Sequence, residues 1–154
     1  NPIVLGIVTV FFIIQLCFPF RYLLYPGELF WNEQGYRFSW RVMLIEKKGI
    51  TNLKVFNKED GKSFMVMNEK FLSEFQERQM SFQPDFILEY AHHVGEYYKK
   101  NGMNEIEIYA DSYVTLNGRL SQRFIDPNVK LLDEKRGFKN KTWILALDDE
   151  ITGL

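Results

Sequence analysis

Cysteine and histidine are scarce in this sequence, which limits its disulfide and metal chemistry. Cys17 is the only cysteine, so the chain can form neither an internal disulfide nor a thiolate metal cluster. The only histidines, His92 and His93, are neighbours, and adjacent side chains on a helix point about 100° apart. Glu89 lies four residues from His93, and Glu96 lies four residues from His92, so each pair could supply two ligands of a metal site. Because that ligand set is incomplete, we expect no metal cofactor.

An excess of one charge and the common signature loops are also missing. The 154 residues include 19 Lys and Arg and 20 Asp and Glu, which gives a formal net charge of -1. A nucleic-acid-binding face would need a basic stripe. The sequence has no glycine-rich phosphate loop and no Gly-x-Ser-x-Gly motif. We therefore expect no nucleic-acid partner. The sequence also gives no motif evidence for a phosphate-binding loop or for a serine-hydrolase nucleophile.

Charged residues are absent before Arg21, and residues 2–20 form a nearly continuous apolar run. A bilayer core about 30 Å thick needs roughly 20 helical residues. A secretory signal would need a basic amino-terminal region and a small-residue cleavage site, and the run has neither. Because the sequence opens at Asn1 without an initiator methionine, we expect more protein upstream. We predict a transmembrane helix at 1–21, a juxtamembrane connector at 22–35 and an extramembrane domain at 36–154.

Alternating apolar residues predict the first part of a sheet. Tyr36–Glu46 places apolar side chains on one face, which is typical of a strand. Lys47-Lys48-Gly49 indicates a turn, after which Thr51–Asn57 resumes the alternation. Asp60-Gly61 predicts a hairpin turn because both residues tolerate positive φ, and Ser63–Met67 is the return strand.

Two helices and a second hairpin follow. Asn68 suits the cap of a helix that ends near Met80, and Pro84 suits the first turn of a helix that Gly102 stops. Glu105–Leu116 has the pattern of a strand, Asn117-Gly118 that of a hairpin turn, and Arg119–Ile125 that of the return strand. The chain is therefore expected to be α+β: an amino-terminal transmembrane helix followed by an antiparallel sheet of hairpins with two covering helices.

Aromatic and basic side chains supply the candidate binding surfaces. Four aromatic residues stand close together just after the apolar run, at Trp31, Tyr36, Phe38 and Trp40. A quinone-like or lipid-like ligand suits such a surface, and packing against the membrane part suits it equally. Arg119, Gln122 and Arg123 are candidates for an anionic partner or for a solvated strand face. A weak basic patch, which faces lipid headgroups or water, is expected from Lys135, Arg136, Lys139 and Lys141.

Two longer segments resemble a known family. Residues 31–43 (WNEQGYRFSWRVM) resemble the juxtamembrane segment of the vitamin K-dependent gamma-carboxylase family, whose bacterial branch belongs to the horizontally transferred transmembrane proteins. Residues 108–127 (IYADSYVTLNGRLSQRFIDP) resemble the family's strand-hairpin-strand that ends in Asp-Pro. Between them, Gln79-Met80-Ser81 and Pro84-Asp85 are similar to the bacterial members. The resemblance spans nearly the whole chain in one order.

The resemblance implies a membrane enzyme that uses vitamin K hydroquinone or menaquinol, oxygen and carbon dioxide. Oxygenation of the quinol to its epoxide yields a strong base, which removes a γ-proton from a glutamyl side chain, and the carbanion then attacks carbon dioxide. The family's catalytic lysine lies upstream, so this chain is expected to be the inactive carboxyl-terminal part. The resemblance also places its soluble domain on the non-cytoplasmic side. The expected partners are the lipid bilayer, the upstream transmembrane helices of the same protein and a glutamyl-containing protein or peptide.

The resemblance carries only a few residues over to this chain. Trp31, Tyr36, Ser39 and Trp40 match animal as well as bacterial members and are expected to bind substrate, and no catalytic residue is assigned. Further matches, which we interpret as structural, are Gln122, Arg123, Asp126 and Pro127. The alternative function is a membrane-anchored, non-catalytic module that binds a partner protein or lipid.

Overall fold

The computed structural model describes residues 1–41 and 45–149, and it has the expected α+β fold. An apolar amino-terminal helix, α1 (Pro2–Cys17), continues into the 3-10 helix η1 (Phe18–Leu24). The domain follows with helices and strands in the order α2 (Leu29–Asn32), β1 (Lys47–Asn57), β2 (Ser63–Met65), η2 (Asn68–Lys70), α3 (Glu74–Met80), α4 (Pro84–Lys100), β3 (Ile106–Leu116) and β4 (Gln122–Arg123).

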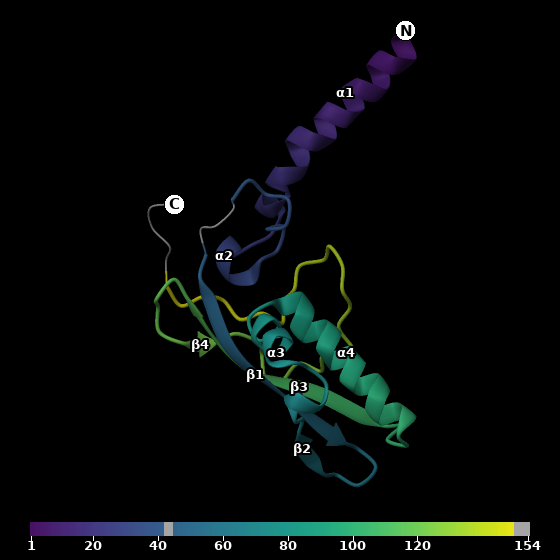
Figure 1. Cartoon of the computed structure of the whole chain (residues 1–154), viewed down its shortest axis with the longest axis vertical. Helices are drawn as coiled ribbons and strands as arrows, with labels where there is room; N and C mark the ends of the chain where they lie inside the picture. Colours follow the sequence, from purple (N-terminus) through teal and green to yellow (C-terminus); the bar gives the residue numbers. More distant parts are fainter. Residues whose placement is uncertain (42–44, 150–154) are drawn as a thin grey trace.

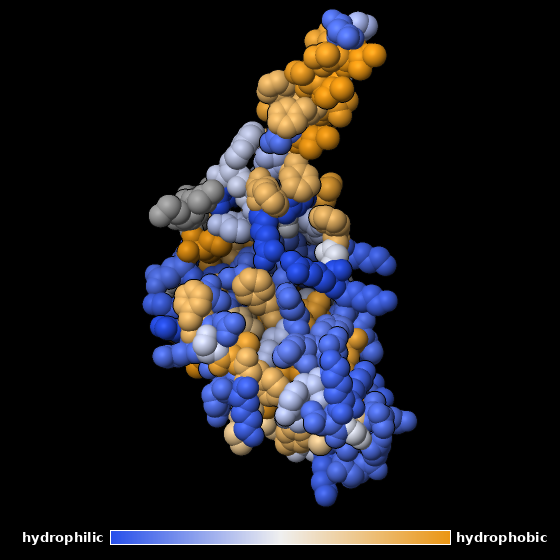
Figure 2. Space-filling model, turned by 45° about the vertical axis from the view of Figure 1, so that its right-hand side comes forward, coloured by the Kyte–Doolittle hydropathy of each residue, from blue (hydrophilic) through white to orange (hydrophobic). Residues whose placement is uncertain are grey.

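Helix α1 projects from the domain as a rod, and none of its residues is buried (Figure 1). Together with η1 it forms a stretch of 23 residues, Pro2–Leu24, that is long and apolar enough to cross a membrane by length and composition. Figure 2 shows this rod as a continuous hydrophobic surface above a domain that is mostly hydrophilic. A fully solvated apolar helix is unfavourable in water, because burying apolar surface is the main driving force of folding.

The domain is built on a four-stranded antiparallel sheet with the strand order β2-β1-β3-β4. The two long central strands pair over their whole length, from Lys47 opposite Leu116 to Asn57 opposite Ile106. Along β3, alternate side chains from Ile106 to Leu116 are buried, as the period of a strand with one covered face requires. Helix α4 covers that face and buries Ile87, Leu88, Ala91 and Val94 (Figure 1).

Several predicted elements are confirmed. Helix α4 begins at Pro84 and its chain reverses at Gly102, which has a φ of 95°. Gly61 and Asn117-Gly118 adopt the positive φ values that the two predicted hairpin turns require. The return strands are shorter than predicted: β2 ends at Met65, and β4 comprises Gln122 and Arg123 only.

The predicted strand Tyr36–Glu46 is wrong over its described residues. Residues 36–40 form turns and a bend: the Ser39 amide donates to the Tyr36 carbonyl oxygen over 3.0 Å, and Phe38 has a φ of 63°. Phe38 and Trp40 pack against Phe18 and Phe20 of η1, and no strand among the described residues pairs with residues 36–40. Val42 and Leu44 lie outside the described residues.

The predicted turn at Lys47-Lys48-Gly49 is also wrong, because these residues begin β1 and pair with the end of β3. Gly49 is needed for a reason other than a turn. A Cβ at this position would lie 2.6 Å from the Ser81 carbonyl oxygen. The glycine therefore lets the strand pass close to the end of α3.

The predicted helix from Asn68 to Met80 is divided into η2 and α3. Ser73 is the actual cap of α3, and it forms a capping box with Gln76. The Asn68 amide instead donates to the Thr51 carbonyl oxygen at 3.0 Å and to Glu77 Oε1 at 2.8 Å. Those tertiary bonds take the side chain away from a capping position.

Candidate functional site

The connector between η1 and the sheet is tightly packed. Asn32 organises it, because its Oδ1 accepts from the Gln34 amide at 2.8 Å and its Nδ2 donates to the Pro26 carbonyl oxygen at 3.0 Å. Gly35 has a φ of 79°, and a Cβ there would lie 2.6 Å from the Tyr22 Cα. Only glycine allows the connector to lie this close to η1.

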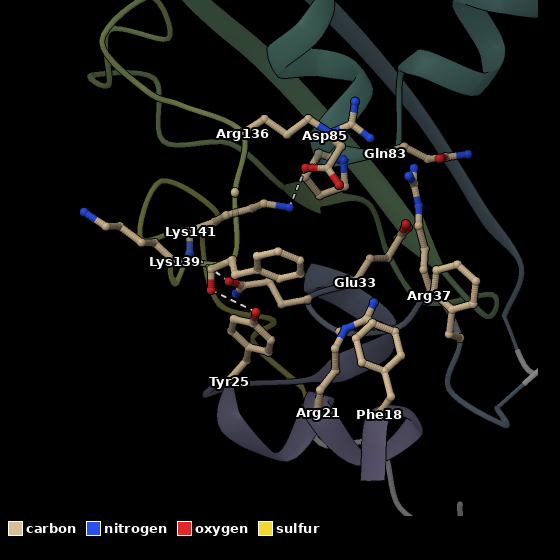
Figure 3. Close-up of a pocket in the computed structure, with 16 residues that line it drawn as sticks. Phe18, Arg21, Tyr25, Glu33, Arg37, Gln83, Asp85, Arg136, Lys139 and Lys141 are labelled. Carbon is tan, nitrogen blue, oxygen red and sulfur yellow. Dashed lines mark hydrogen bonds and ion pairs between the residues drawn. The ribbon is translucent and has the colours of Figure 1, made fainter. Parts of the chain in front are cut away.

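A pocket of about 320 Å³ opens where this connector meets η1 and the start of α4. We call it the basic pocket, because its lining includes five cationic and two anionic side chains: Arg21, Arg37, Arg136, Lys139, Lys141, Glu33 and Asp85. Figure 3 shows Arg21 and Phe18 entering it from η1 and Arg136 and Asp85 lying at the opposite side. The pocket therefore joins segments from both ends of the chain.

Both acidic side chains of the basic pocket are already matched by lysines. Asp85 lies 2.6 Å from Lys141, and Glu33 lies 2.7 Å from Lys47. Arg136 has a looser partner, because Glu89 is 3.4 Å away and both side chains are mostly exposed. The remaining positive charge favours an anion in this pocket.

Arg21 has an incomplete set of hydrogen bonds. Its guanidinium lies 4.4 Å from the centre of the Phe18 ring and 5.8 Å from that of Phe38. Its Nη1 is buried and has no hydrogen-bond partner among residues 1–41 and 45–149. A buried donor left without a partner costs about 1–3 kcal/mol. An acceptor group in the pocket would remove that cost.

The far wall of the basic pocket is fixed to the connector by three hydrogen bonds. Tyr25 donates its hydroxyl to the Phe138 carbonyl oxygen at 2.8 Å. The Gln34 side chain donates from Nε2 to Asn140 Oδ1 at 3.0 Å, and its Oε1 accepts from the Lys141 backbone amide at 2.8 Å. Three members of the predicted basic patch, Arg136, Lys139 and Lys141, are thereby brought into the pocket, whereas Lys135 lines a separate hollow beside His92.

Two of the four predicted substrate-binding residues are buried. The Trp31 side chain is 1% exposed, donates from Nε1 to the Leu145 carbonyl oxygen at 2.7 Å and packs edge-on against Phe124. Ser39 is buried and donates its hydroxyl to the Tyr36 carbonyl oxygen at 2.6 Å. Neither side chain lines the basic pocket. Any role they have in binding is therefore one of positioning.

The other two predicted residues are more accessible. The Tyr36 ring is half-buried and lies 6.2 Å from that of Phe30; burial, followed by the charge of Glu33, raises the pKa of its phenol. The Trp40 side chain is 66% exposed and packs edge-on against Phe20. We call the exposed rings at this end of the domain the aromatic collar: Phe18, Phe20, Phe38 and Trp40.

A buried ion pair beside the connector was missed by sequence reasoning. Lys47 Nζ donates to Glu33 Oε1 at 2.7 Å and to the Trp31 carbonyl oxygen at 2.8 Å, and it lies 4.6 Å from the centre of the Phe124 ring. Burial outweighs the attraction of Glu33 and lowers the pKa of Lys47. The prediction of a turn at Lys47 hid this role. The pairing of Lys47 with the apolar Leu116 of β3 is the signal that could have revealed a buried lysine.

The remaining sequence candidates contact other parts of the chain. His92 Nε2 lies 2.9 Å from the Glu134 carbonyl oxygen, whereas the exposed His93 ring packs edge-on against Phe71. Within residues 1–41 and 45–149, no group of three or more His, Cys, Asp or Glu side chains could hold a metal ion. Arg119 pairs with Asp149 at 2.7 Å. The basic pocket is thus the strongest candidate site that these residues form.

Comparison with known proteins gives one family. A family model of the vitamin K-dependent gamma-carboxylase lumenal domain matches residues 1–150. No solved structure matches the chain significantly. The matched range includes α1, η1 and every strand of the sheet.

Proposed function

This chain belongs to the family of the vitamin K-dependent gamma-carboxylase lumenal domain, and from that premise we propose that it is part of an integral membrane enzyme that couples quinol epoxidation to glutamate carboxylation. In this proposal α1 and the first turn of η1 span the membrane and the α+β domain lies on the lumenal, non-cytoplasmic side. The observation that carries the proposal is the family match itself, which continues through both the apolar helix and the domain.

The proposal assigns the reacting groups to other membrane helices of the enzyme. When bound, reduced vitamin K or menaquinol supplies, through its oxygenation, the base that removes a γ-proton from a glutamyl side chain. By the family resemblance the catalytic lysine is not one of the lysines of this chain. We therefore propose that the chain is inactive alone and contributes binding and positioning.

The aromatic collar fits one edge of a quinol site. A lipid-soluble quinol reaches the domain from the bilayer, and the exposed rings of Trp40 and Phe38 lie beside the end of the candidate span. These rings offer flat apolar faces for stacking but form no enclosed cavity, so neighbouring helices must complete the site. Within this edge, the Tyr36 hydroxyl is the group we assign to hydrogen bonding with the quinol or the glutamyl side chain.

Trp31 and Ser39 support the same edge from behind. Trp31 fixes the connector to the core through Leu145, and Ser39 closes the turn that presents Trp40. Both residues therefore enter the proposal as positioning residues for Tyr36 and Trp40.

An epoxidase assay of the full-length protein tests the proposal. The enzyme is supplied with reduced vitamin K or menaquinol, with and without a glutamyl peptide, and epoxide and carboxylated product are measured. Both products indicate a carboxylase, and epoxide alone indicates that only the first half-reaction is retained. Absence of both products with a correctly folded protein refutes the proposal.

Variants of the accessible residues test the site assignment. Tyr36→Ala and Trp40→Ala should each lower epoxidation or glutamate use about threefold to tenfold, since one aromatic contact contributes about 0.5–1.5 kcal/mol. Phe75→Ala is the matched control, because the Phe75 ring is also 66% exposed but lies on α3. Unchanged turnover in Tyr36→Ala and Trp40→Ala, at normal expression, removes both residues from the site.

A second function is a non-catalytic, membrane-anchored module that binds lipid or a partner protein. The unmatched positive charge of the basic pocket is the observation that favours it. The same epoxidase assay separates the two functions, because a non-catalytic module yields no epoxide with either quinol.

A further inference from the structure

The basic pocket lies at the depth of lipid headgroups if α1 spans the membrane as proposed. The 16 residues of α1 rise about 24 Å, and the first turn of η1 adds about 6 Å. This length is sufficient for a hydrocarbon core about 30 Å thick, and Arg21 is the first charged residue after the apolar stretch, so the boundary of the core lies near Phe20. Arg21, the next residue, then lies among the phosphate groups.

The pocket is also built for an acceptor with several oxygen atoms. Arg21, Arg37 and Arg136 contribute guanidinium groups from η1, the turn after α2 and the loop after β4. The guanidinium fork matches the oxygens of a phosphate, which can accept from more than one arginine at once. Lys47 and Lys141 balance the charges of the Glu33 and Asp85 carboxylates, so the arginines leave the pocket with a net positive charge.

The walls of the pocket are held in place before any ligand binds. The loop that contains Arg136 is fixed by Tyr25 and Gln34, and Arg21 is held against the Phe18 ring. A preorganised site loses little conformational freedom on binding. The Arg21 side chain lines the pocket, and its Nη1 has no hydrogen-bond partner among the described residues.

We infer that the basic pocket binds a phosphate group at the membrane surface, and that an anionic phospholipid headgroup is its source. This inference rests on the proposed placement of α1 in the membrane. In this inference the rings of Phe18 and Phe38, which also line the pocket, contact the glycerol and upper acyl region of the same lipid. The contact fixes the height of the domain above the bilayer.

Titration calorimetry on the full chain in mild detergent tests the inference. The four titrants are dioctanoyl phosphatidylglycerol, dioctanoyl phosphatidylcholine, inorganic phosphate and a glutamyl peptide. We expect phosphatidylglycerol to bind at least about tenfold more tightly than phosphatidylcholine. Both lipids carry a phosphodiester anion, but phosphatidylcholine also carries a choline cation, which the arginines repel. Arg21→Gln combined with Arg37→Gln should abolish that preference.

Matched variants separate the pocket from general charge. Lys99→Gln combined with Lys100→Gln removes the same two positive charges at the exposed end of α4, and the preference should persist. Arg21→Lys keeps the charge but loses the guanidinium fork, and it should bind phosphatidylglycerol more weakly than the unmodified chain while remaining folded. The thermal unfolding midpoint of each variant verifies its fold.

The outcomes assign or overturn the inference. Inorganic phosphate that binds as tightly as phosphatidylglycerol, and depends on Arg21 and Arg37, supports phosphate recognition but makes soluble phosphate the source. Equal binding of the two lipids without phosphate binding overturns the inference. Pocket-dependent binding of the glutamyl peptide alone also overturns it and makes the pocket a peptide site. The epoxidase result is independent, so the failure of either proposal is recognised separately.

Discussion

Replacing Lys47 with methionine tests whether the connector is rigidly attached to the sheet. The Lys47 side chain is 2% exposed and its ammonium group joins Glu33 and the Trp31 carbonyl oxygen at the edge of the core. Methionine fills nearly the same volume but lacks the charge. Lys47→Met therefore leaves the Glu33 carboxylate without its partner and the carbonyl without its donor.

The size of the effect follows from the burial of the two partners. Breaking a buried ion pair by removing one side costs about 3–5 kcal/mol. The Glu33 side chain is still 21% exposed, so water can hydrate part of the carboxylate and the lower end applies. We expect the free energy of unfolding to fall by about 3 kcal/mol. In a domain of this size that lowers the unfolding midpoint by about 6–12 °C.

Thermal unfolding in detergent, followed by tryptophan fluorescence, is the assay. Lys48→Met is the matched control, because Lys48 is the next residue of β1 but its side chain is 79% exposed and pairs with the exposed Glu46. That control should unfold like the unmodified chain. Combining Lys47→Met with Glu33→Gln should recover much of the lost stability, because no uncompensated charge remains.

The pH dependence gives a second measurement on the same residue. Because the folded state lowers the pKa of Lys47 below its ordinary 10.5, the folded chain releases this proton before the unfolded chain does. Stability should therefore rise with pH in the window between the folded-state pKa and 10.5, and Lys47→Met should lack that rise. If Lys47→Met has the same unfolding midpoint as Lys48→Met, the ion pair does not stabilise the connector and this reasoning is refuted.

Two further predictions concern the connector and the outer sheet face. Gly35→Ala should lower the free energy of unfolding by at least about 2 kcal/mol, because the added Cβ would collide with η1. Gly61→Ala is the control: its Cβ meets open space, so it should cost only about 1 kcal/mol for the positive φ. Thermal unfolding of the two variants compares these costs. Hydrogen bonds from Lys130, Tyr109 and Lys58 lower the pKa of Glu107 to about 2, so its contribution to stability is complete above 4.5 and is lost as the pH falls toward 2. Glu107→Gln should therefore flatten the acid limb of the stability curve between those pH values, and an unchanged limb would assign acid unfolding to other carboxylates.

The parts of the fold that were predictable from sequence have local causes. Pro84 and Gly102 define α4 through backbone geometry, and Asn117-Gly118 defines a hairpin for the same reason. The start of β1 was not predictable in this way, because Lys47-Lys48-Gly49 has the composition of a turn. Its strand conformation comes from pairing with the end of β3, nearly 70 residues away in sequence.

The candidate site could be predicted only in pieces. The connector aromatics and the basic residues near the end of the chain were each recognised, but as separate surfaces. Gln34 joins them through hydrogen bonds to Asn140 and Lys141, which are 106 and 107 residues away. A glutamine in a loop carries no pattern that indicates such a partner. Arg21 was recognised as the end of the apolar run, whereas the lack of a partner for its Nη1 among the described residues is visible only in three dimensions.

The division of the chain at residues 21 and 35 stays a prediction, but the contacts of the connector show what such a division would mean physically. Trp31 belongs to the core of the domain, and Gly35 packs directly on η1. A connector fixed at both ends transmits the orientation of α1 to the sheet, as a flexible linker does not. If the basic pocket holds a lipid phosphate, the aromatic collar is therefore kept at a constant height at the bilayer surface. In the proposed enzyme, a quinol from the membrane and a glutamyl side chain from the lumen would meet at an edge whose position depends on this packing, so we expect Lys47 and Gly35 to affect catalysis without touching either substrate.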